Sequence, residues 1–243
     1  AYSNYYGINY ASNTGIYHCG KISRNRISAP NANGFGIYCY YLNGPNCIVL
    51  NNMINIGTGS GSASYGMYMG YSNCRIHHNT VNITSGNANS FAAYIYNNAY
   101  SGPSSDIRYN IFANSGNGST SGYCIYSVSN STSFTTIDSN VYYQGTGAGN
   151  FGNFNGTAYA TFAAWKAAMG APYDPGSIVA NPNFFSQTNP RINSVANIRS
   201  VPRQSYMTED IDGARCGVVT ETGADDHPAA NDIGVSSISN PLN

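Results

Sequence analysis

The chain has 243 residues, of which only 8% are charged, and its ten basic residues are balanced by ten acidic ones. A neutral chain with so few charges gives no indication of a basic surface that would steer nucleic acid. Its 42% hydrophobic and 13% aromatic content exceeds that of a disordered chain, and no apolar run is long enough to predict insertion into a membrane.

One short pattern recurs five times between Ile22 and Tyr142. It consists of an aliphatic residue, two further residues, an asparagine, one residue and then an aliphatic or aromatic residue, as in Ile76–Asn79–Val81. The recurring asparagines are Asn25, Asn52, Asn79, Asn110 and Asn140. Their spacing is nearly constant at about 30 residues, and a period of this size indicates a repeat architecture.

Each repeat unit is expected to contain three short β-strands. Apolar residues alternate with other residues on both sides of the asparagine, as at Cys74 and Ile76 before Asn79 and at Val81 and Ile83 after it. A further strand opens each unit, at residues 36–38, 66–68, 94–96 and 124–126. We expect the asparagine to occupy the bend, because its short side chain tolerates left-handed dihedrals.

Three strands in about 30 residues without a helix describe one coil of a parallel β-helix. We therefore predict an all-β fold of about five or more coils, in which the five asparagines form an internal ladder. A β-sandwich is the alternative, although its strands would not keep one asparagine in register. Either Tyr10 or residues 15–17 supply the first strand of the first coil.

The coils are predicted to occupy residues 1–142, and residues 143–243 are predicted to add the last coil, one short helix and an irregular C-terminal cap of the same domain. Residues 161–170 form the helix, since Thr161 can cap its start and Gly170 can end it. Phe162, Trp165 and Met169 share the face that we expect to cover the last coil. Residues 177–185 are expected to return to the sheet as a strand.

The repeats and the tail together resemble a known family. The coils are similar to the PbH1-type repeats of right-handed, pectate-lyase-like parallel β-helix proteins. Segments 138–143, 161–165, 180–184, 210–215 and 232–234 follow the order seen at the C-terminal end of the β-helix domain in many secreted bacterial surface proteins. The resemblance implies an extracellular or cell-surface location. It implies no single activity, because that group mixes lyases, hydrolases and adhesins.

The start of the chain bears on its extent. Residues 5–8 already read as part of a repeat unit, without a capping element before them. We therefore expect further coils or domains of a parent chain.

Cysteines and acidic residues are the candidates for disulfides and for metal ligands. Cys47 and Cys74 occupy the same inward position in adjacent coils and are expected to be buried thiols, although a disulfide is the alternative. The cap residues Asp210, Asp212, Asp225 and Asp226 are candidates for a Ca²⁺ site, with Asx-type turns as the competing interpretation. We expect no other metal or cofactor.

Few groups in the coils suit catalysis. A hydrolase needs a pair of nearby carboxylates, and the coils contain only Asp106 and Asp138. By register Arg75 stacks against Asp106, and Arg108 against Asp138, which predicts surface ion pairs. The alternative is a polysaccharide lyase or glycoside hydrolase in a groove along one sheet. Its lyase form would use Arg75, His77 and Arg108, with His77 as the base.

Tyrosines recur beside the inward aliphatic residues. Tyr38, Tyr68, Tyr96 and Tyr126 follow nearly the same period as the asparagines, and Tyr40, Tyr41 and Tyr94 widen the set. An outward tyrosine column stabilises a sheet and also offers an amphipathic surface for a glycan or a partner protein.

The sequence therefore favours a secreted, non-catalytic β-helix module of a larger surface protein. Its expected role is adhesion, binding of a polysaccharide or cell-surface partner, or rigid support. Besides the enzyme, the remaining alternative is a filament-forming subunit that assembles through its coil ends.

Overall fold

A computed structural model describes residues 5–11, 19–32, 34–57, 63–85, 89–96, 105–116, 122–128, 134–145 and 149–226. The predicted alternative strand at residues 15–17 and the cap segment at residues 232–234 lie outside these ranges. Within them no helix has both the length and the apolar character needed to cross a membrane.

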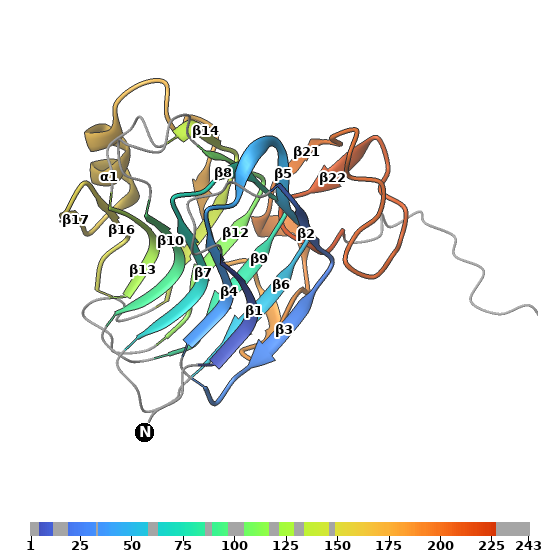
Figure 1. The fold of residues 1–243 in the computed structure, drawn as a ribbon, viewed down its shortest axis with the longest axis horizontal. Helices are drawn as coiled ribbons and strands as arrows, with labels where there is room; N and C mark the ends of the chain where they lie inside the picture. The colour runs from blue at the N-terminus through green and yellow to red at the C-terminus, as the bar shows by residue number, and fades with distance from the viewer. Residues whose placement is uncertain are drawn as a thin grey trace, which may run out of the picture.

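Three sheets form the body of the molecule, and most of their strands pair in parallel with strands from the preceding and following repeat units (Figure 1). Sheet A contains β1 (Tyr5–Ala11), β4 (Gly34–Tyr40), β7 (Ser64–Gly70), β10 (Ser90–Tyr96), β13 (Gly122–Ser127), β16 (Gly152–Phe154) and the antiparallel β17 (Thr157–Tyr159). Sheet B contains β2 (Lys21–Ser23), β5 (Asn43–Leu50), β8 (Asn73–His77), β11 (Ser105–Arg108) and β14 (Phe134–Asp138). Sheet C contains β3 (Arg26–Ala29), β6 (Met53–Ile56), β9 (Thr80–Ile83), β12 (Ile111–Asn114), β15 (Val141–Gln144) and β18 (Ile178–Val179).

The fold is thus a parallel β-solenoid, as the repeat pattern predicts. It makes about four turns, slightly fewer than the five or more that we expected. The regular turns are β4–β6, β7–β9, β10–β12 and β13–β15, and each contributes one strand to every sheet. In the first repeat, β1 contains Tyr10 and pairs with β4.

The five asparagines form the predicted ladder. Each side-chain oxygen from Asn52 onward accepts two hydrogen bonds, from the backbone N–H and the side-chain amide of the asparagine one turn earlier, at 2.9–3.1 Å. The ladder ends at Ser177, whose hydroxyl accepts from the backbone N–H of Asn140 at 2.7 Å. Asn52, Asn79, Asn110 and Asn140 are buried. Because their polar atoms are hydrogen-bonded, this interior can hold amides.

The left-handed residue at the bend is not the ladder asparagine. The positive φ angles belong to the residue just before it, namely Arg24, Asn51, His78, Tyr109 and Ser139. The ladder asparagine instead uses its side chain to bind the adjacent turns. Our assignment of the left-handed conformation was therefore wrong by one residue, because the side-chain hydrogen bonds require the asparagine to point inward.

Two consecutive residues face inward in the strands of sheet A. In β4 these are Gly36 and Ile37: a Cβ on Gly36 would lie 2.4 Å from Cγ2 of Ile54 in the core, and Ile37 is fully buried. Gly66 approaches Val81 in the same way in the next turn. As a consequence, outward residues occur three positions apart, at Phe35 and Tyr38.

The predicted helix is α1 (Phe162–Met169). The hydroxyl of Thr161 accepts a hydrogen bond from the backbone N–H of Ala164 at 3.2 Å, and Gly170 follows the helix with a φ of 75°. Trp165 and Met169 are buried, and the Trp165 ring contacts Phe151 and Tyr142 of the last turn. The helix therefore covers the end of the core, as expected.

The chain after residue 180 covers the outer faces of sheets B and C. It contains β19 (Phe184–Ser186) paired antiparallel with β20 (Asn189–Ile192), the 3₁₀ helix η2 (Val195–Asn197), and β21 (Ser200–Pro202) paired antiparallel with β22 (Val219–Glu221). The predicted strand at 177–185 is thus divided between β18, which joins sheet C, and β19, which does not.

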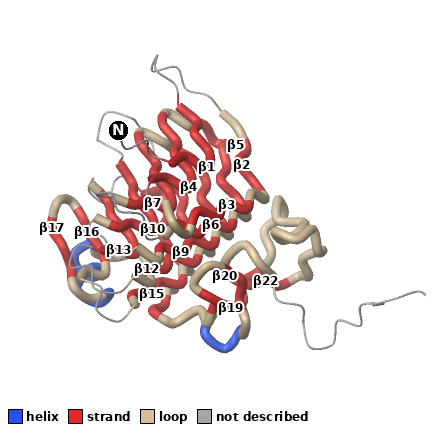
Figure 2. The backbone as a smooth tube through the Cα atoms, turned by 90° about the horizontal axis from the view of Figure 1, so that it is seen from below, coloured by secondary structure: helices blue, strands red, loops and turns tan. Residues whose placement is uncertain are grey.

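Apolar contacts attach this C-terminal chain to the two sheets. Met207 packs on Ile48 and Leu50 of sheet B, and Ile192 packs on Ile111 and Val141 of sheet C. Figure 1 shows β21 and β22 beside sheet B, and Figure 2 shows β19 and β20 beside β9 of sheet C. These contacts determine which faces of the solenoid a ligand can reach.

Candidate functional site

The outer surface of sheet A is covered by aromatic rings in two columns, which we call the aromatic face. The first column consists of Tyr6, Phe35, Tyr65, Phe91 and Tyr123, and the second consists of Tyr38, Tyr68, Tyr94 and Tyr126. Within a column, successive rings are nearly parallel, with centroids 4.6–5.6 Å apart. The parallel strand register produces this stacking, because equivalent residues repeat at the inter-strand spacing.

Rings of one column lie edge-to-face against rings of the other, with interplanar angles of 75–88°. Successive rings of a column are about 4.8 Å apart along the stack, whereas ring planes in contact are about 3.5–4.0 Å apart. Each ring must therefore tilt by roughly 40° from the plane perpendicular to the stack. Opposite tilts in the two columns account for the near-perpendicular planes. Seven of the nine rings in the resulting herringbone keep part of their surface exposed, whereas Phe91 and Tyr123 of the first column are buried.

The second column differs from our prediction at one position. Tyr94, not Tyr96, lies between Tyr68 and Tyr126 in the register. Tyr96 pairs with Gly70 in the register. The ring of Tyr40 covers Gly70, and a Cβ added to this glycine would lie 2.4 Å from the Tyr40 ring. Tyr96 instead contacts Tyr71, 5.1 Å away between centroids, at the edge of the aromatic face.

The strands of sheet A contain no charged residue. Burial raises the pKa of Tyr68, Tyr65, Tyr38 and Tyr126 above its ordinary value, and neighbouring tyrosines raise it further. The same causes raise the pKa of Tyr94 to about 12. These five hydroxyls therefore stay protonated at neutral pH, and each can both donate and accept a hydrogen bond.

Sheet B brings together the three residues of the alternative catalytic prediction. Arg75 pairs in register with Asp106, and Arg108 pairs with Asp138, as predicted. The expected cross-strand ion pairs were nevertheless wrong, because Asp106 binds Arg108 of its own strand through two hydrogen bonds of 2.6 Å.

His77 connects this cluster to the C-terminal chain. Its Nε2 lies 3.1 Å from a carboxylate oxygen of Asp106, and its Nδ1 contacts the hydroxyl of Tyr206. Nε2 is buried and lies near Asp106, but it makes no hydrogen bond within the described residues. When Nε2 carries the imidazole proton, Nδ1 can accept the proton of the phenol. Arg75 lies over the ring of Tyr206, 5.6 Å from its centroid. We call Arg75, His77, Asp106, Arg108 and Tyr206 the charged cluster.

Burial governs the electrostatics of the charged cluster. The side chain of His77 is fully buried, and this burial lowers its pKa, so the imidazole is neutral at pH 7. Burial raises the pKa of Asp106, but the neighbouring His77 and the hydrogen-bonded Arg108 outweigh this effect and lower the pKa to about 2. Burial also raises the pKa of Tyr206 to about 12, against the effect of Arg108. No local sequence pattern pointed to Tyr206, which lies 129 residues from His77.

The acidic residues of the cap are partly neutralised by arginines. Asp210, Asp212 and Asp225 place carboxylate oxygens within 4.8 Å of one another. Asp212 forms ion pairs with Arg26 and Arg191. Asp210 also accepts backbone hydrogen bonds from Asp212 and Ala214 at 2.8 and 2.9 Å, the Asx-type turn of the competing interpretation. Calcium binding here stays a prediction.

All six cysteines are free thiols. Cys47 and Cys74 are buried, as the pattern predicts, and burial raises the pKa of Cys47 to about 11. They act as small core residues, since a protonated buried thiol is a poor nucleophile and metal ligand.

Comparison with protein families, with curated proteins and with solved structures finds no match to this chain. The repeat geometry and the side-chain arrangement therefore carry the functional interpretation.

Proposed function

We propose that the protein is a non-catalytic β-helix module of a secreted surface protein, and that it binds a neutral glycan along the aromatic face. The observation that carries this proposal is the herringbone of nine rings on a sheet without charged residues. The C-terminal chain covers the outer faces of sheets B and C. On sheet A, seven of the nine rings keep part of their surface exposed, and Phe91 and Tyr123 are buried.

The chemistry of the face matches an uncharged polysaccharide. Sugar rings combine apolar C–H surfaces with hydroxyl groups, and tyrosine offers a rigid ring with a hydroxyl at its edge. A charged polymer would lose hydration on this face without meeting a compensating charge. The columns repeat along the solenoid axis, so a polymer with its own repeat can form the same contact several times.

The test is a binding screen against neutral and acidic polysaccharides by affinity electrophoresis or calorimetry. Replacing Tyr68 and Tyr94 together by alanine is expected to weaken binding of a neutral glycan at least tenfold, because central aromatic residues dominate such interfaces. Phe185→Ala is the matched control, since this exposed ring lies on β19, outside the aromatic face.

Near-ultraviolet circular dichroism must show that the double variant keeps its fold. Unchanged binding in a folded double variant would remove the aromatic face from consideration. Binding restricted to acidic polymers would contradict the neutral-glycan assignment, and no binding to any polymer would favour a purely structural role for the stacked rings.

We propose a lyase for acidic polysaccharides as the second candidate. The observation in its favour is the contact chain Asp106–His77–Tyr206, flanked by two arginines. Tyr206 would take the proton next to a uronate carboxylate while its own proton moves to Nδ1 of His77. A C=C bond forms, the glycosidic C–O bond breaks, and the leaving oxygen takes a proton from water. Arg75 and Arg108 would neutralise the carboxylate.

This candidate predicts an unsaturated product, detected by its ultraviolet absorbance after incubation with uronate polymers. Tyr206→Phe should abolish product formation, while Arg203→Ala, an exposed cation outside the charged cluster, should leave it unchanged. Absence of product from every uronate polymer tested would leave the charged cluster with a structural role, as the attachment of the C-terminal chain.

A further inference from the structure

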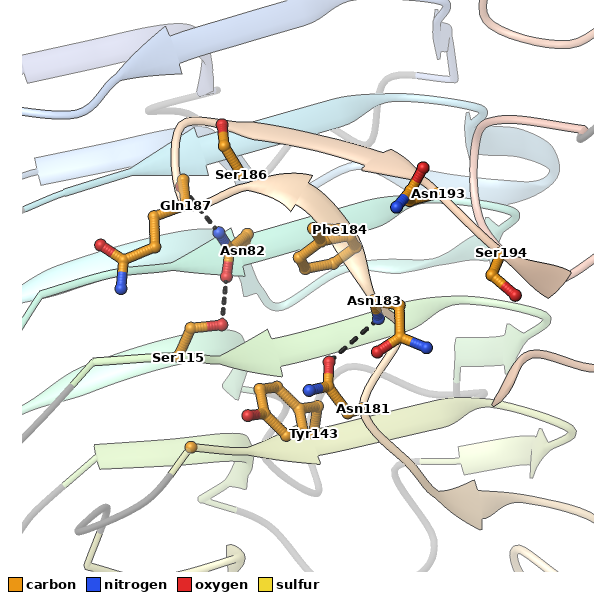
Figure 3. Close-up of a pocket in the computed structure, with 11 residues that line it drawn as sticks. Asn82, Ser115, Tyr143, Asn181, Asn183, Phe184, Ser186, Gln187, Asn193 and Ser194 are labelled. Atoms are coloured by element: carbon orange, nitrogen blue, oxygen red, sulfur yellow. Dashed lines mark hydrogen bonds between the residues drawn. The ribbon is translucent and has the colours of Figure 1, made fainter. Parts of the chain in front are cut away.

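A cleft of about 600 Å³ lies between the outer surface of sheet C and the hairpin β19–β20 (Figure 3). Asn82 of β9 and Tyr143 of β15 contribute from the sheet, together with Ser115 after β12. The chain from Asn181 to Ser194 forms the opposite wall. This volume lies within the range of sites for small ligands.

The lining of the cleft is polar but carries no charge. Carboxamides come from Asn82, Asn181, Asn183, Gln187 and Asn193, hydroxyls come from Ser115, Ser186, Ser194 and Tyr143, and Phe184 adds a second ring. The cleft therefore contains many donors and acceptors, two aromatic rings and no acidic or basic side chain among the described residues that line it.

The walls are held in place by hydrogen bonds and packing. Asn82 donates to the backbone carbonyl of Gln187 at 3.0 Å and accepts from the hydroxyl of Ser115 at 2.7 Å. On the hairpin side, the side chain of Asn181 accepts from the backbone N–H of Asn183 at 2.9 Å. Phe184 packs on the apolar cluster that attaches the hairpin to sheet C. The two walls are thus joined before any ligand arrives.

Several polar groups at the cleft have no protein partner among the described residues. The side-chain amides of Gln187 and Asn193 and the hydroxyl of Tyr143 are not used in hydrogen bonds within the described parts of the chain. Figure 3 shows Asn193 on the far strand of the hairpin and Tyr143 on the sheet, on opposite sides of the cleft. These groups are available to a ligand, and their removal should not affect folding.

We propose that this amide cleft is a second ligand site, for one or two units of a neutral saccharide. Carboxamides and hydroxyls pair with sugar hydroxyls in either direction, and Tyr143 and Phe184 suit the apolar C–H surface of a sugar ring. A charged ligand would lose its hydration without a counter-charge, and an apolar ligand would leave the amides without partners. The site is separate from the aromatic face, which lies on sheet A.

The test is calorimetric or NMR titration with neutral mono- and disaccharides, with a sialylated and a uronate-containing sugar as charged comparisons. The wild-type chain should bind at least one neutral sugar. Gln187→Ala and Asn193→Ala should each weaken that binding about fivefold to tenfold, the effect of one lost hydrogen bond. Asn189→Ala, a carboxamide of the same hairpin that does not line the cleft, should leave the affinity unchanged.

Chemical-shift changes should centre on the cleft residues in the wild-type chain. No binding to any neutral sugar, exclusive binding of charged sugars, or wild-type affinity in both cleft variants would overturn the proposal. Replacing Tyr68 and Tyr94 by alanine separates the two sites, because it should weaken polymer binding by the aromatic face and leave the affinity of the cleft for small sugars unchanged.

Discussion

The aromatic face of sheet A and the charged cluster of sheet B are two outer faces of the same coils with opposite chemistry. The first has no charged residue in its strands and repeats the same ring from turn to turn. The second carries Arg75, Asp106 and Arg108 and is joined to a distant part of the chain through Tyr206.

The comparison shows how one scaffold assigns separate roles to its faces. A repeated outward residue stacks on its own copies, so the aromatic face is completed by the repeat itself. The buried polar groups of the charged cluster cannot be satisfied by a repeat, and they require partners such as Tyr206 from outside the coils. A periodic surface therefore suits a polymer, and a unique cluster suits one attachment or one reaction.

The largest expected effect comes from the asparagine ladder, which lies at the bends between sheets B and C. Asn79→Ala removes the amide that joins Asn52 to Asn110 and leaves buried backbone groups without partners. Each such group costs about 1–3 kcal/mol, so the free energy of unfolding should fall by about 3–5 kcal/mol. Urea denaturation measures the loss.

The far-ultraviolet signal and the tyrosine signal should disappear together in this variant, because all three sheets are built from the same coils. Asn189→Ala, at an exposed position in the hairpin, is the control and should change the stability little. Separate transitions for the two signals would show that the faces do not share one cooperative scaffold.

Acid should weaken the attachment of the C-terminal chain, whereas alkali should destabilise the aromatic face. Burial lowers the pKa of His78 to about 3, and its ring donates to the carbonyl of Glu221 in the C-terminal chain at 3.2 Å. When the C-terminal chain detaches, the imidazole of His78 regains its ordinary pKa of 6.5 and takes up a proton below that pH. Attachment of the C-terminal chain therefore weakens progressively from pH 6.5 toward pH 3. The contribution of Asp106 is lost in addition from pH 3.8 toward pH 2.

The tyrosines of the aromatic face respond on the alkaline side. Their raised pKa stabilises the folded state below pH 10, and this contribution is lost as the pH rises above that value. Hydrogen exchange measures the effects of acid and of alkali. In acid, the amide of Gly223, which donates to the carbonyl of Tyr109, should lose protection first. His78→Gln should remove much of the acid response, and simultaneous loss of protection in sheet A would contradict this assignment.

A moderate effect is expected from Tyr206→Phe, which removes one hydroxyl and leaves Nδ1 of His77 without a partner. The free energy of unfolding should fall by about 1–2 kcal/mol, because the histidine stays buried. Amides of the C-terminal chain should exchange faster while those of sheet A do not change. Arg203→Ala is the control, and faster exchange throughout the solenoid would show that Tyr206 supports more than its own face.

Local repetition explains what the sequence could predict. The spacing of the asparagines predicted the parallel coils and the ladder, because one hydrogen-bonding pattern must recur at each turn. The ends of α1 were predictable because their hydrogen bonds are local: the hydroxyl of Thr161 accepts from the backbone N–H of Ala164, and the backbone N–H of Gly170 donates to the carbonyl of Lys166.

The error at Tyr96 came from matching the aliphatic–tyrosine pair at 95–96 to the pair at 37–38. A better signal was present, because Ser64-Tyr65-Gly66-Met67-Tyr68 and Ser90-Phe91-Ala92-Ala93-Tyr94 share a serine, a ring, a small residue and a final tyrosine. Tyr206 and the amide cleft had no local signal. They depend on how the irregular C-terminal chain lies against the sheets.

The smallest effect on stability should come from Tyr68→Phe, in the centre of the second column. The ring keeps its stacking against Tyr38 and Tyr94, at 4.9 and 5.0 Å, and only a hydroxyl at the partly exposed edge is lost. The free energy of unfolding should therefore change by less than about 0.5 kcal/mol. If hydroxyls of the aromatic face bind the glycan, affinity should nevertheless fall about fivefold to tenfold. Urea denaturation measures the free energy of unfolding, and calorimetry measures the affinity for the glycan. Tyr126→Phe, at the end of the column, is the matched variant. A loss of stability without a loss of affinity would mean that the face holds the solenoid together and does not bind glycan through its hydroxyls.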